Sequence, residues 1–183
     1  MDPELIFEPF PKLARLFREC VITEKIDGSN AQVAISDDLK TVQAGSRNRW
    51  LSPGRETDNL GFASWVEANR EELLQLGPGR HFGEWWGQGI QRTYGLKEKR
   101  FSLFNHDRWF DAAVRPKCCH VVPLLHEGVF SEDTVKLVLT GLATNGSLAV
   151  DGWMKPEGIV VYHRASQKGF KVTLDGDGHK GVK

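Results

Sequence analysis

The chain has 183 residues, which is enough for one domain with a sizeable core. Its 24 basic and 24 acidic residues balance, so binding to a polyanion would depend on a local basic surface rather than on bulk charge. Hydrophobic residues make up 40% of the sequence and charged residues 26%, as in ordinary soluble globular proteins. No signal peptide or membrane-length apolar run is visible, so we expect a cytoplasmic protein that does not enter a membrane.

Residues 1–183 are expected to form a single domain, in which the glycine-rich residues 175–183 are a flexible tail. The three cysteines, Cys20, Cys118 and Cys119, form neither a disulfide framework nor a C-x-x-C zinc pattern, which predicts buried, reduced thiols. None of the six histidines lies in an H-x-x-x-H or H-E-x-x-H pattern, so no zinc site is expected. The sequence also lacks a P-loop and a G-x-S-x-G motif.

In chain order, prolines keep residues 1–11 extended, and residues 12–19 form either a short helical turn or the approach to the first strand. Helical spacing predicts one helix at residues 62–74, with Ser64 and Glu67 as a capping box. It predicts a second helix at residues 132–143, with Ser131 as the N-cap. A single helical turn is expected at residues 107–114.

Strand patterns outnumber helical ones, and hairpins and long connections separate them. This order predicts an α+β fold with mainly antiparallel sheets flanked by helices. The expected strands cover residues 20–22, 31–35, 41–46, 80–86, 100–105, 119–125, 159–163 and 169–174. The first two of these strands are joined by Gly-Ser-Asn at residues 28–30, which predicts a tight turn.

Lys25 lies in the segment T-E-K-I-D-G-S-N, between two carboxylates and at the end of the first predicted strand, where it would face a cleft. A lysine there can act as a covalent nucleophile if it loses its proton, which requires its pKa to fall by ~3 units from ~10.4, or roughly 4 kcal/mol. Glu24 and Asp27 oppose that shift, whereas a nearby cation favours it. An edge-strand lysine paired with its neighbours is the commoner meaning of K-x-D-G, so the rest of the chain must decide.

Two loops carry groups that could meet a ligand. Arg47, Arg49 and Arg55 fall within nine positions, where they either bind phosphates or form a solvated loop. Residues 87–95 contain three glycines and one arginine, so this loop either brings its backbone close to a ligand or is a plain connection.

Together these features form an ordered set: Lys25 in K-x-D-G, Arg47 after a serine, Glu84 after a glycine, Phe104 near a strand end, Glu157 in E-G-I-V-V and Lys171 in F-K-V. The set resembles that of the covalent nucleotidyltransferases, which include ATP-dependent polynucleotide ligases and mRNA capping enzymes. T-E-K-I-D-G-S-N is most similar to the T-E-K-I-x-G-T-N of RNA ligase 2-type enzymes, which seal nicks in RNA. The resemblance covers residues 20–174 and implies an adenylyltransferase domain.

The resemblance implies the chemistry of the first step. Lys25 would attack the α-phosphate of ATP, release pyrophosphate and keep AMP as a phosphoramidate. Lys171 would bind the α-phosphate and favour loss of the proton from the nucleophile by like-charge proximity. Glu84 would accept a hydrogen bond from the ribose, and Phe104 would stack on the adenine.

Further nucleotide contacts are implied for four residues. Glu157 would help to hold Mg²⁺ or Mn²⁺, since these hard cations prefer oxygen ligands. Glu24 would accept a hydrogen bond from the adenine amino group, which would favour ATP over GTP. Asn30 would bind the nucleotide, and Arg47 would contact the ribose or the nucleic-acid end. Lys168 would either assist Lys171 or be solvated on a turn.

The resemblance also implies an RNA partner. AMP would move to a 5′-phosphate end, which would then be sealed to a 3′-hydroxyl, where a ribose 2′-OH can be recognised. Candidate contacts to nucleic acid are Arg47, Arg49 and Arg92, and the basic residues around them extend this surface: Arg55, Lys97, Lys99 and Arg100.

The chain departs from the family pattern in three ways. Its last motif has Lys171 alone where K-x-K is common, and Phe104 is followed by Asn105 where aspartate is usual. No C-terminal OB domain is expected after the last strand, so a helper protein could supply part of the grip on RNA. Two alternatives stay open: a DNA ligase core or GTP-using capping enzyme, and a non-catalytic module that binds nucleotides or RNA ends.

Overall fold

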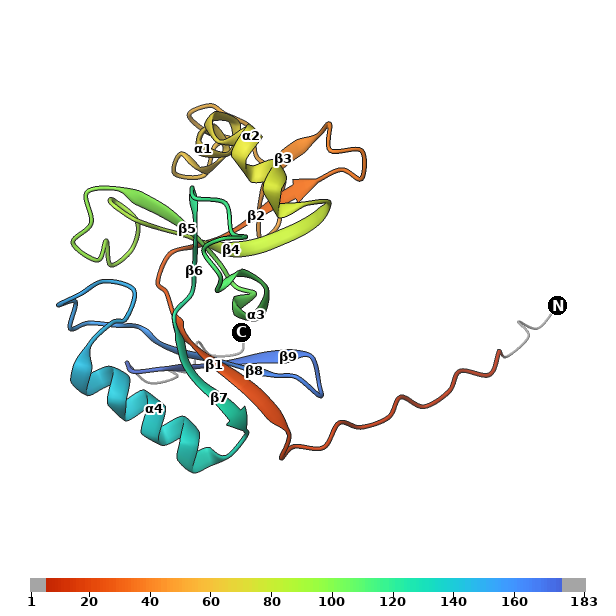
Figure 1. Cartoon of the computed structure of the whole chain (residues 1–183), viewed down its shortest axis with the longest axis vertical. Coiled ribbons are helices and arrows are strands. Elements are labelled where there is room, and N and C mark those ends of the chain that lie inside the picture. The colour runs from red at the N-terminus through yellow and green to blue at the C-terminus, as the bar shows by residue number, and fades with distance from the viewer. Residues whose placement is uncertain (1–5, 176–183) are drawn as a thin grey trace, which may run out of the picture.

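The computed structural model describes residues 6–175, which fold into two β-sheets that face each other, with helices on their outer sides (Figure 1). Within these residues, sheet A has four strands in the order β7-β1-β8-β9, and sheet B has five in the order β3-β2-β4-β5-β6. Neighbouring strands are antiparallel except β5 and β6, which are parallel. The expected α+β class with mainly antiparallel sheets is confirmed.

The bounds of the elements follow most of the predicted ranges. Sheet A comprises β1 (Glu19–Lys25), β7 (Leu124–Val129), β8 (Gly158–His163) and β9 (Lys168–Thr173). Sheet B comprises β2 (Ser29–Ile35), β3 (Val42–Ser46), β4 (Gly79–Gly87), β5 (Lys99–Leu103) and β6 (Cys119–Val121). The helices are α1 (Phe62–Ala68), α2 (Arg70–Leu73), the 3₁₀ helix η1 (Leu74–Leu76), α3 (His106–Trp109) and α4 (Glu132–Asn145).

Each sheet buries its outer face against helices. On sheet B, Val33 and Phe101 belong to a core cluster with Phe62 of α1 and Leu73 of α2. On sheet A, apolar residues of β1 and β8 pack with Leu142 of α4. Because side chains alternate along a strand, the inner faces carry the other half of each strand's residues and are free for polar groups.

A third apolar cluster joins the two sheets. Ile26, Trp86, Tyr94 and Val122 are all nearly fully buried and pack together where residues 26–28 cross from β1 to β2. The tight turn predicted at residues 28–30 is therefore wrong as a hairpin, since β1 belongs to sheet A and β2 to sheet B. The Gly-Ser-Asn segment changes the direction of the chain without pairing the strands that it connects.

Three other expectations also change. The helix predicted at residues 62–74 is interrupted at Asn69, and its capping box is absent: the backbone N–H groups of Ala63 and Ser64 donate to Asp58 Oδ1 at 2.5 and 3.1 Å. The strand predicted at residues 119–125 divides at Pro123 into β6 and β7, as expected for a residue without a backbone donor. Residues 12–18 form no helix, and Leu13 is 85% exposed.

The chain ends agree in part with the sequence. Residues 6–11 are exposed and extend away from the sheets, as the prolines predict (Figure 1). The flexible tail predicted at residues 175–183 lies outside the described residues apart from Asp175. The predicted N-cap of α4 is confirmed, since the backbone N–H of Thr134 donates to Ser131 Oγ at 3.1 Å. Between residues 6 and 175, no helix is long and apolar enough to span a membrane.

The crossing between the sheets depends on Gly28, which suggests a direct test. A Cβ at this position would lie 2.5 Å from the carbonyl oxygen of Trp85, inside contact distance of the β4 backbone. We expect Gly28→Ala to lower the free energy of unfolding by about 1–3 kcal/mol through overpacking, and the melting temperature by several degrees. Thermal and urea unfolding measure the change.

Gly141 in α4 is the matched control, since a Cβ there meets no atom of another element within 4 Å. We expect Gly141→Ala to leave stability unchanged or to raise it by up to about 1 kcal/mol, because alanine favours a helix. Equal stability of the Gly28→Ala and parent proteins would show that the crossing tolerates a side chain.

Candidate functional site

A cavity of about 810 Å³ lies between the inner faces of the two sheets, a size suited to a small-molecule ligand. Residues from both sheets line it, so neither sheet alone forms the site. Among its lining residues are seven that the sequence singled out: Glu24, Lys25, Asn30, Arg47, Glu84, Phe104 and Lys171. Glu157 contacts the same site through the side chain of Lys25.

Lys25 is the last residue of β1 and lies on the inner face of sheet A, since Cys20 and Ile22 on alternate positions pack toward α4. Its Nζ donates to Glu157 Oε2 at 2.5 Å, and the side chains of the pair are 22% and 17% exposed. Glu157 directly precedes β8, whose Gly158 pairs with Lys25. In this structure the carboxylate therefore stabilises the charged ammonium.

Lys171 lies on the same inner face. Thr23 pairs with Val160 and Val160 pairs with Lys171, so the three side chains form one row across β1, β8 and β9. Strand spacing puts the backbones of β1 and β9 roughly 10 Å apart, within reach of two long side chains. Among residues 6–175, no carboxylate forms an ion pair with Lys171, so its charge is available to a ligand in the cavity.

Glu84 occupies the facing wall, on β4 of sheet B. It is only 7% exposed, and burial raises its pKa to about 7, although the charge of Lys25 and a hydrogen bond from Asn30 act in the opposite direction. Asn30 Nδ2 donates to Glu84 Oε2 at 3.0 Å, and Arg47 Nε donates to Asn30 Oδ1 at 2.8 Å. These bonds connect the exposed rim at Arg47 with the buried carboxylate.

Glu24 does not meet the prediction made for it. Glu24 lines part of the cavity, but its carboxylate is turned toward the loop after α4, and the residue is 1% exposed. There its carboxylate accepts hydrogen bonds from Ser147 Oγ at 2.6 Å and from the backbone N–H of Leu148 at 2.8 Å. Burial raises the pKa of Glu24, and the hydrogen bonds counteract that effect. The carboxylate therefore holds the loop after α4 and is not available to an adenine amino group.

The aspartate of K-x-D-G stabilises the crossing between the sheets. The backbone N–H of Asp27 donates to the hydroxyl of Tyr94 at 2.8 Å, and its carboxylate accepts from Arg92 Nε at 2.9 Å. Burial raises the pKa of Tyr94, so this hydroxyl stays protonated. Sequence reasoning missed Tyr94, which carried no signal beyond its place in the glycine-containing loop.

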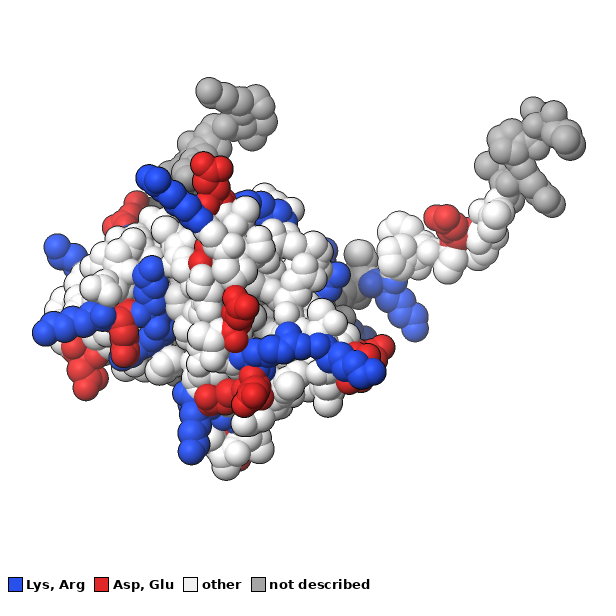
Figure 2. Space-filling view, turned by 90° about the horizontal axis from the view of Figure 1, so that it is seen from above, with Lys and Arg blue, Asp and Glu red and all other residues white. Residues whose placement is uncertain are grey.

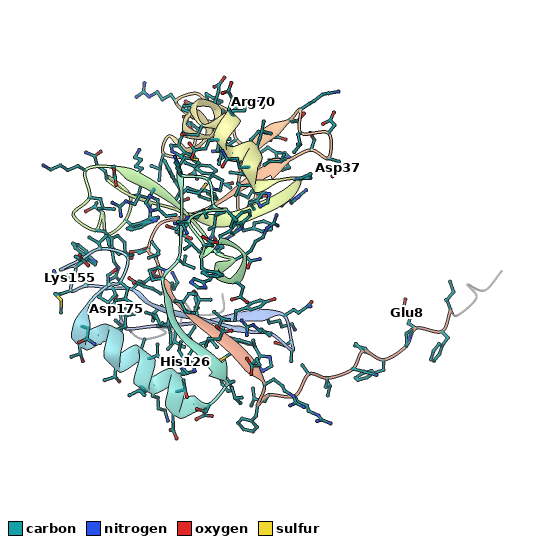
Figure 3. The ribbon with its side chains drawn as sticks, viewed as in Figure 1. Glu8, Asp37, Arg70, His126, Lys155 and Asp175 are labelled. Carbon is teal, nitrogen blue, oxygen red and sulfur yellow. The ribbon has the colours of Figure 1, made fainter. Side chains whose placement is uncertain are left out.

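Arg92 was expected to contact nucleic acid, but its guanidinium is occupied within the protein. Besides Asp27, it binds Asp175 Oδ2 at 2.5 Å and the carbonyl oxygen of Lys155 at 3.3 Å. Figure 3 shows Lys155 and Asp175 at the same end of the molecule. Arg92 therefore holds segments distant in sequence together, and it does not line the cavity.

Three other basic residues expected at the nucleic-acid surface also have partners within the protein. Arg49 does not line the cavity, and its Nη2 donates to the carbonyl oxygen of Glu56 at 3.3 Å. Lys99 and Arg100 also have internal partners, the carbonyl oxygen of Leu60 at 2.7 Å and the carboxylate of Glu98 at 2.6 Å. Figure 2 shows basic and acidic side chains interleaved on the face in view, without a large area of one sign.

Phe104 also lines the cavity. It follows β5, is 42% exposed and continues the sheet through a hydrogen bond from its N–H to the carbonyl oxygen of Phe82 at 2.9 Å. Asn105, which stands where the family usually has aspartate, caps α3 by accepting from the N–H of Arg108 at 3.2 Å. Tyr162 also lines the cavity and was missed, although its alternation with Val160 on β8 indicates the same face.

The residues present fit a divalent cation only in part. The described part of the chain contains no group of three or more histidine, cysteine, aspartate or glutamate side chains that could hold a metal ion. Mg²⁺ and Mn²⁺ on nucleotides, however, need only one or two carboxylates in addition to phosphate oxygens and water. Glu157, whose carboxylate binds Nζ of Lys25 at the site, fits that requirement.

The buried carboxylate of Glu84 predicts a stability that depends on pH. Its folded-state pKa of about 7 lies above the ordinary value of 4.5. Its contribution to stability is therefore fully present below pH ~4.5 and is lost as pH rises through ~7. We expect Glu84→Gln to be more stable than the parent above pH ~7, by at most about 3 kcal/mol, with a difference that shrinks toward pH ~5.

Urea unfolding at several pH values measures this difference. Glu67→Gln, on the exposed side of α1, controls for the loss of a carboxylate without burial. If the difference in stability between Glu84→Gln and the parent is the same at acid and alkaline pH, Glu84 is not a buried carboxylate with a raised pKa.

Comparison with known proteins agrees with this geometry. A family model described as RNA ligase matches residues 18–173. A search of curated proteins gives no match. A lysine-to-alanine variant of Naegleria gruberi RNA ligase, solved with ATP and Mn, is 20% identical with a TM-score of 0.62, over 86% of this chain and 50% of that chain. A glutamate-to-alanine variant, solved with AMP and Mn, is 19% identical with a TM-score of 0.62, over 87% of this chain and 51% of that chain.

This chain therefore spans about half the length of the solved structures that it matches, and at this identity the likeness shows the fold. The family match covers most of the chain, including the segment around Lys25 and the last strand of sheet A. The chain belongs to the RNA ligase family.

Proposed function

We propose that this protein is an ATP-dependent RNA ligase that adenylylates itself at Lys25. AMP then moves to a 5′-phosphate RNA end, which is sealed to a 3′-hydroxyl. The observation that carries the proposal is the meeting of Lys25, Glu84 and Lys171 at one cavity from strands far apart in sequence.

In the first step, Lys25 Nζ forms a bond to the α-phosphorus of ATP as the bond to the bridging oxygen of the β-phosphate breaks. Pyrophosphate leaves, and the strands position the amine for this displacement. The nucleophile must first lose a proton, whereas its ion pair with Glu157 stabilises the charged form. The pair must therefore separate when the nucleotide binds, and the like charge of Lys171 on the same face favours the neutral amine.

The remaining residues hold the nucleotide. Glu84 would accept a hydrogen bond from the ribose while Asn30 fixes its carboxylate, and Phe104 would stack on the adenine. Arg47 lies at the rim, where it would contact the ribose or the RNA end. Mg²⁺ or Mn²⁺ at Glu157 would neutralise negative charge on the phosphates. The carboxylate of Glu24 already accepts hydrogen bonds from Ser147 and Leu148, so a preference for ATP over GTP would come from other groups of the site.

Two expectations from the sequence stay predictions. A helper protein could supply part of the grip on RNA for the sealing step. A cytoplasmic location is also a prediction, which cell fractionation would test.

Substitution of the nucleophile gives the most direct test. We expect the parent protein, incubated with ATP and Mg²⁺ or Mn²⁺, to gain the mass of one AMP, and Lys25→Ala to gain none because no amine reaches the α-phosphate. Intact-mass spectrometry and labelling with [α-³²P]ATP measure the adduct. Lys136→Ala, an exposed lysine on α4, is the matched control and should form the adduct normally.

An AMP adduct on Lys25→Ala, or its absence from the parent, would contradict the proposal. GTP in place of ATP separates a ligase from a capping-type enzyme. Nicked RNA compared with nicked DNA separates an RNA ligase from a DNA ligase core. Nucleotide or RNA binding without any adduct would indicate a non-catalytic module.

Phe104 predicts how the affinity for ATP depends on stacking. We expect Phe104→Ala to raise the KM for ATP in adduct formation by about 2- to 10-fold, from a stacking free energy of about 0.5–1.5 kcal/mol, with little change in kcat. Phe104→Trp should keep most of the affinity. Phe110→Ala, which removes another exposed phenylalanine just after α3, is the control. An unchanged KM in Phe104→Ala would show that the ring does not stack on the base.

A further inference from the structure

One row of side chains crosses the inner face of sheet B beyond the cavity. Strand register puts Phe104 beside Phe82, Phe82 beside Gln32 and Gln32 beside Gly45, and Gly45 forms a bridge with Trp50. The row begins at Phe104, which lines the cavity, and ends at the far edge of the sheet. We call the part of this row outside the cavity, Phe82, Gln32, Gly45 and Trp50, the aromatic row.

The aromatic side chains of this row are exposed, whereas the opposite face of sheet B packs against α1 and α2. Phe82 is 52% exposed and Trp50 is 45% exposed. Between them, Gln32 lies against Gly45: a Cβ on that glycine would be 2.8 Å from Gln32 Cγ, and Gln32 Nε2 donates to the carbonyl oxygen of Ser46 at 3.0 Å. Aromatic side chains that are exposed along one face of a sheet can serve as stacking platforms for unpaired bases.

Positive charge accompanies these rings. The guanidinium of Arg80 lies 5.3 Å from the ring centroid of Trp50, in a cation–π contact, and belongs to the next row of the same face. Among residues 6–175 no carboxylate forms an ion pair with Arg80, so its charge is free to meet a phosphate. Arg47 lies on the side of the row nearer the cavity, and it hydrogen-bonds Asn30. Rings flanked by guanidinium groups match the alternation of bases and phosphates along a nucleic-acid strand.

We propose that the aromatic row binds an unpaired RNA strand by base stacking, a proposal that rests on the function proposed above. Unstacked bases gain free energy on aromatic side chains, whereas the bases of a duplex are already stacked on each other. A strand lying along the row would reach the cavity at Phe104, so its end would meet the adenylylated lysine. The substrate is therefore an RNA end that is single-stranded, in preference to a nick within a duplex.

Binding is measured without ATP, so that no covalent step is needed. The full chain is titrated into a fluorescein-labelled single-stranded RNA of about ten nucleotides and into a blunt duplex of the same sequence, and anisotropy gives both Kd values. We expect the single strand to bind more tightly than the duplex. Trp50→Ala and Phe82→Ala should each weaken single-strand binding by about 5- to 100-fold, from about 1–3 kcal/mol per stacked base.

Three further variants separate stacking from other causes. Trp50→Phe should keep most of the affinity, because it retains a ring. Arg80→Ala should weaken binding and reduce the slope of log Kd against log salt by about one phosphate contact. Leu137→Ala, which removes an apolar side chain that is 74% exposed on α4, should leave binding unchanged. Circular dichroism and thermal melts confirm that each variant is folded.

Unchanged affinity in both Trp50→Ala and Phe82→Ala would overturn the proposal, as would an equal loss for single strand and duplex. A change of oligomeric state in these variants, seen by sedimentation without loss of RNA affinity, would assign the row to a contact between copies of the chain. The test is independent of the chemistry. If the row variants lose RNA affinity but the parent forms no AMP adduct, the aromatic row binds RNA and the proposed ligase activity is wrong. If the parent forms the adduct but the row variants keep their RNA affinity, the ligase activity stands and the proposed role of the aromatic row is wrong.

Discussion

The site depends on how the two sheets are held against each other. Residues 26–28 cross from β1 to β2 through the buried cluster of Ile26, Trp86, Tyr94 and Val122, and Gly28 lies directly against the backbone of β4. The same few residues therefore fix the end of β1, where Lys25 projects, and the start of β2 opposite Glu84. Since both walls are anchored within a few positions of the lysine, a small shift at this crossing would separate the amine from the facing carboxylate.

The polar groups on the inner faces of the two sheets lower the stability of the fold. Glu84 is buried with a pKa raised to about 7, and the pair of Lys25 with Glu157 is mostly withdrawn from solvent. Buried polar groups of this kind weaken a fold unless they are well paired. The outer faces compensate, because α4 covers sheet A and the helices α1 and α2 cover sheet B with continuous apolar clusters. This division between stable outer faces and polar inner faces is what a ligand site between two sheets requires.

Much of this arrangement could be predicted from the sequence, and the failures have clear physical reasons. Runs of apolar and aromatic residues indicated where β4, β8 and β9 lie, and the order of motifs selected residues that the structure gathers at one cavity. The carboxylate of Glu24 was misassigned because neighbouring side chains of a strand point to opposite faces, so it binds the loop after α4 although the residue lines part of the cavity. The bond between Asp27 and Tyr94 depends on packing between segments far apart in sequence, which no local pattern encodes.

The balance of charge limits how this protein could attract RNA. Arg92 and Arg164 are held in ion pairs with carboxylates, and basic and acidic groups alternate over the face in Figure 2. Arg47 at the cavity and Arg80 farther along the inner face of sheet B remain to contact phosphates. Electrostatic attraction alone would then be weak and easily screened by salt. Stacking is insensitive to net charge, so a neutral chain that binds a polyanion is better served by exposed rings such as Trp50 than by further basic residues.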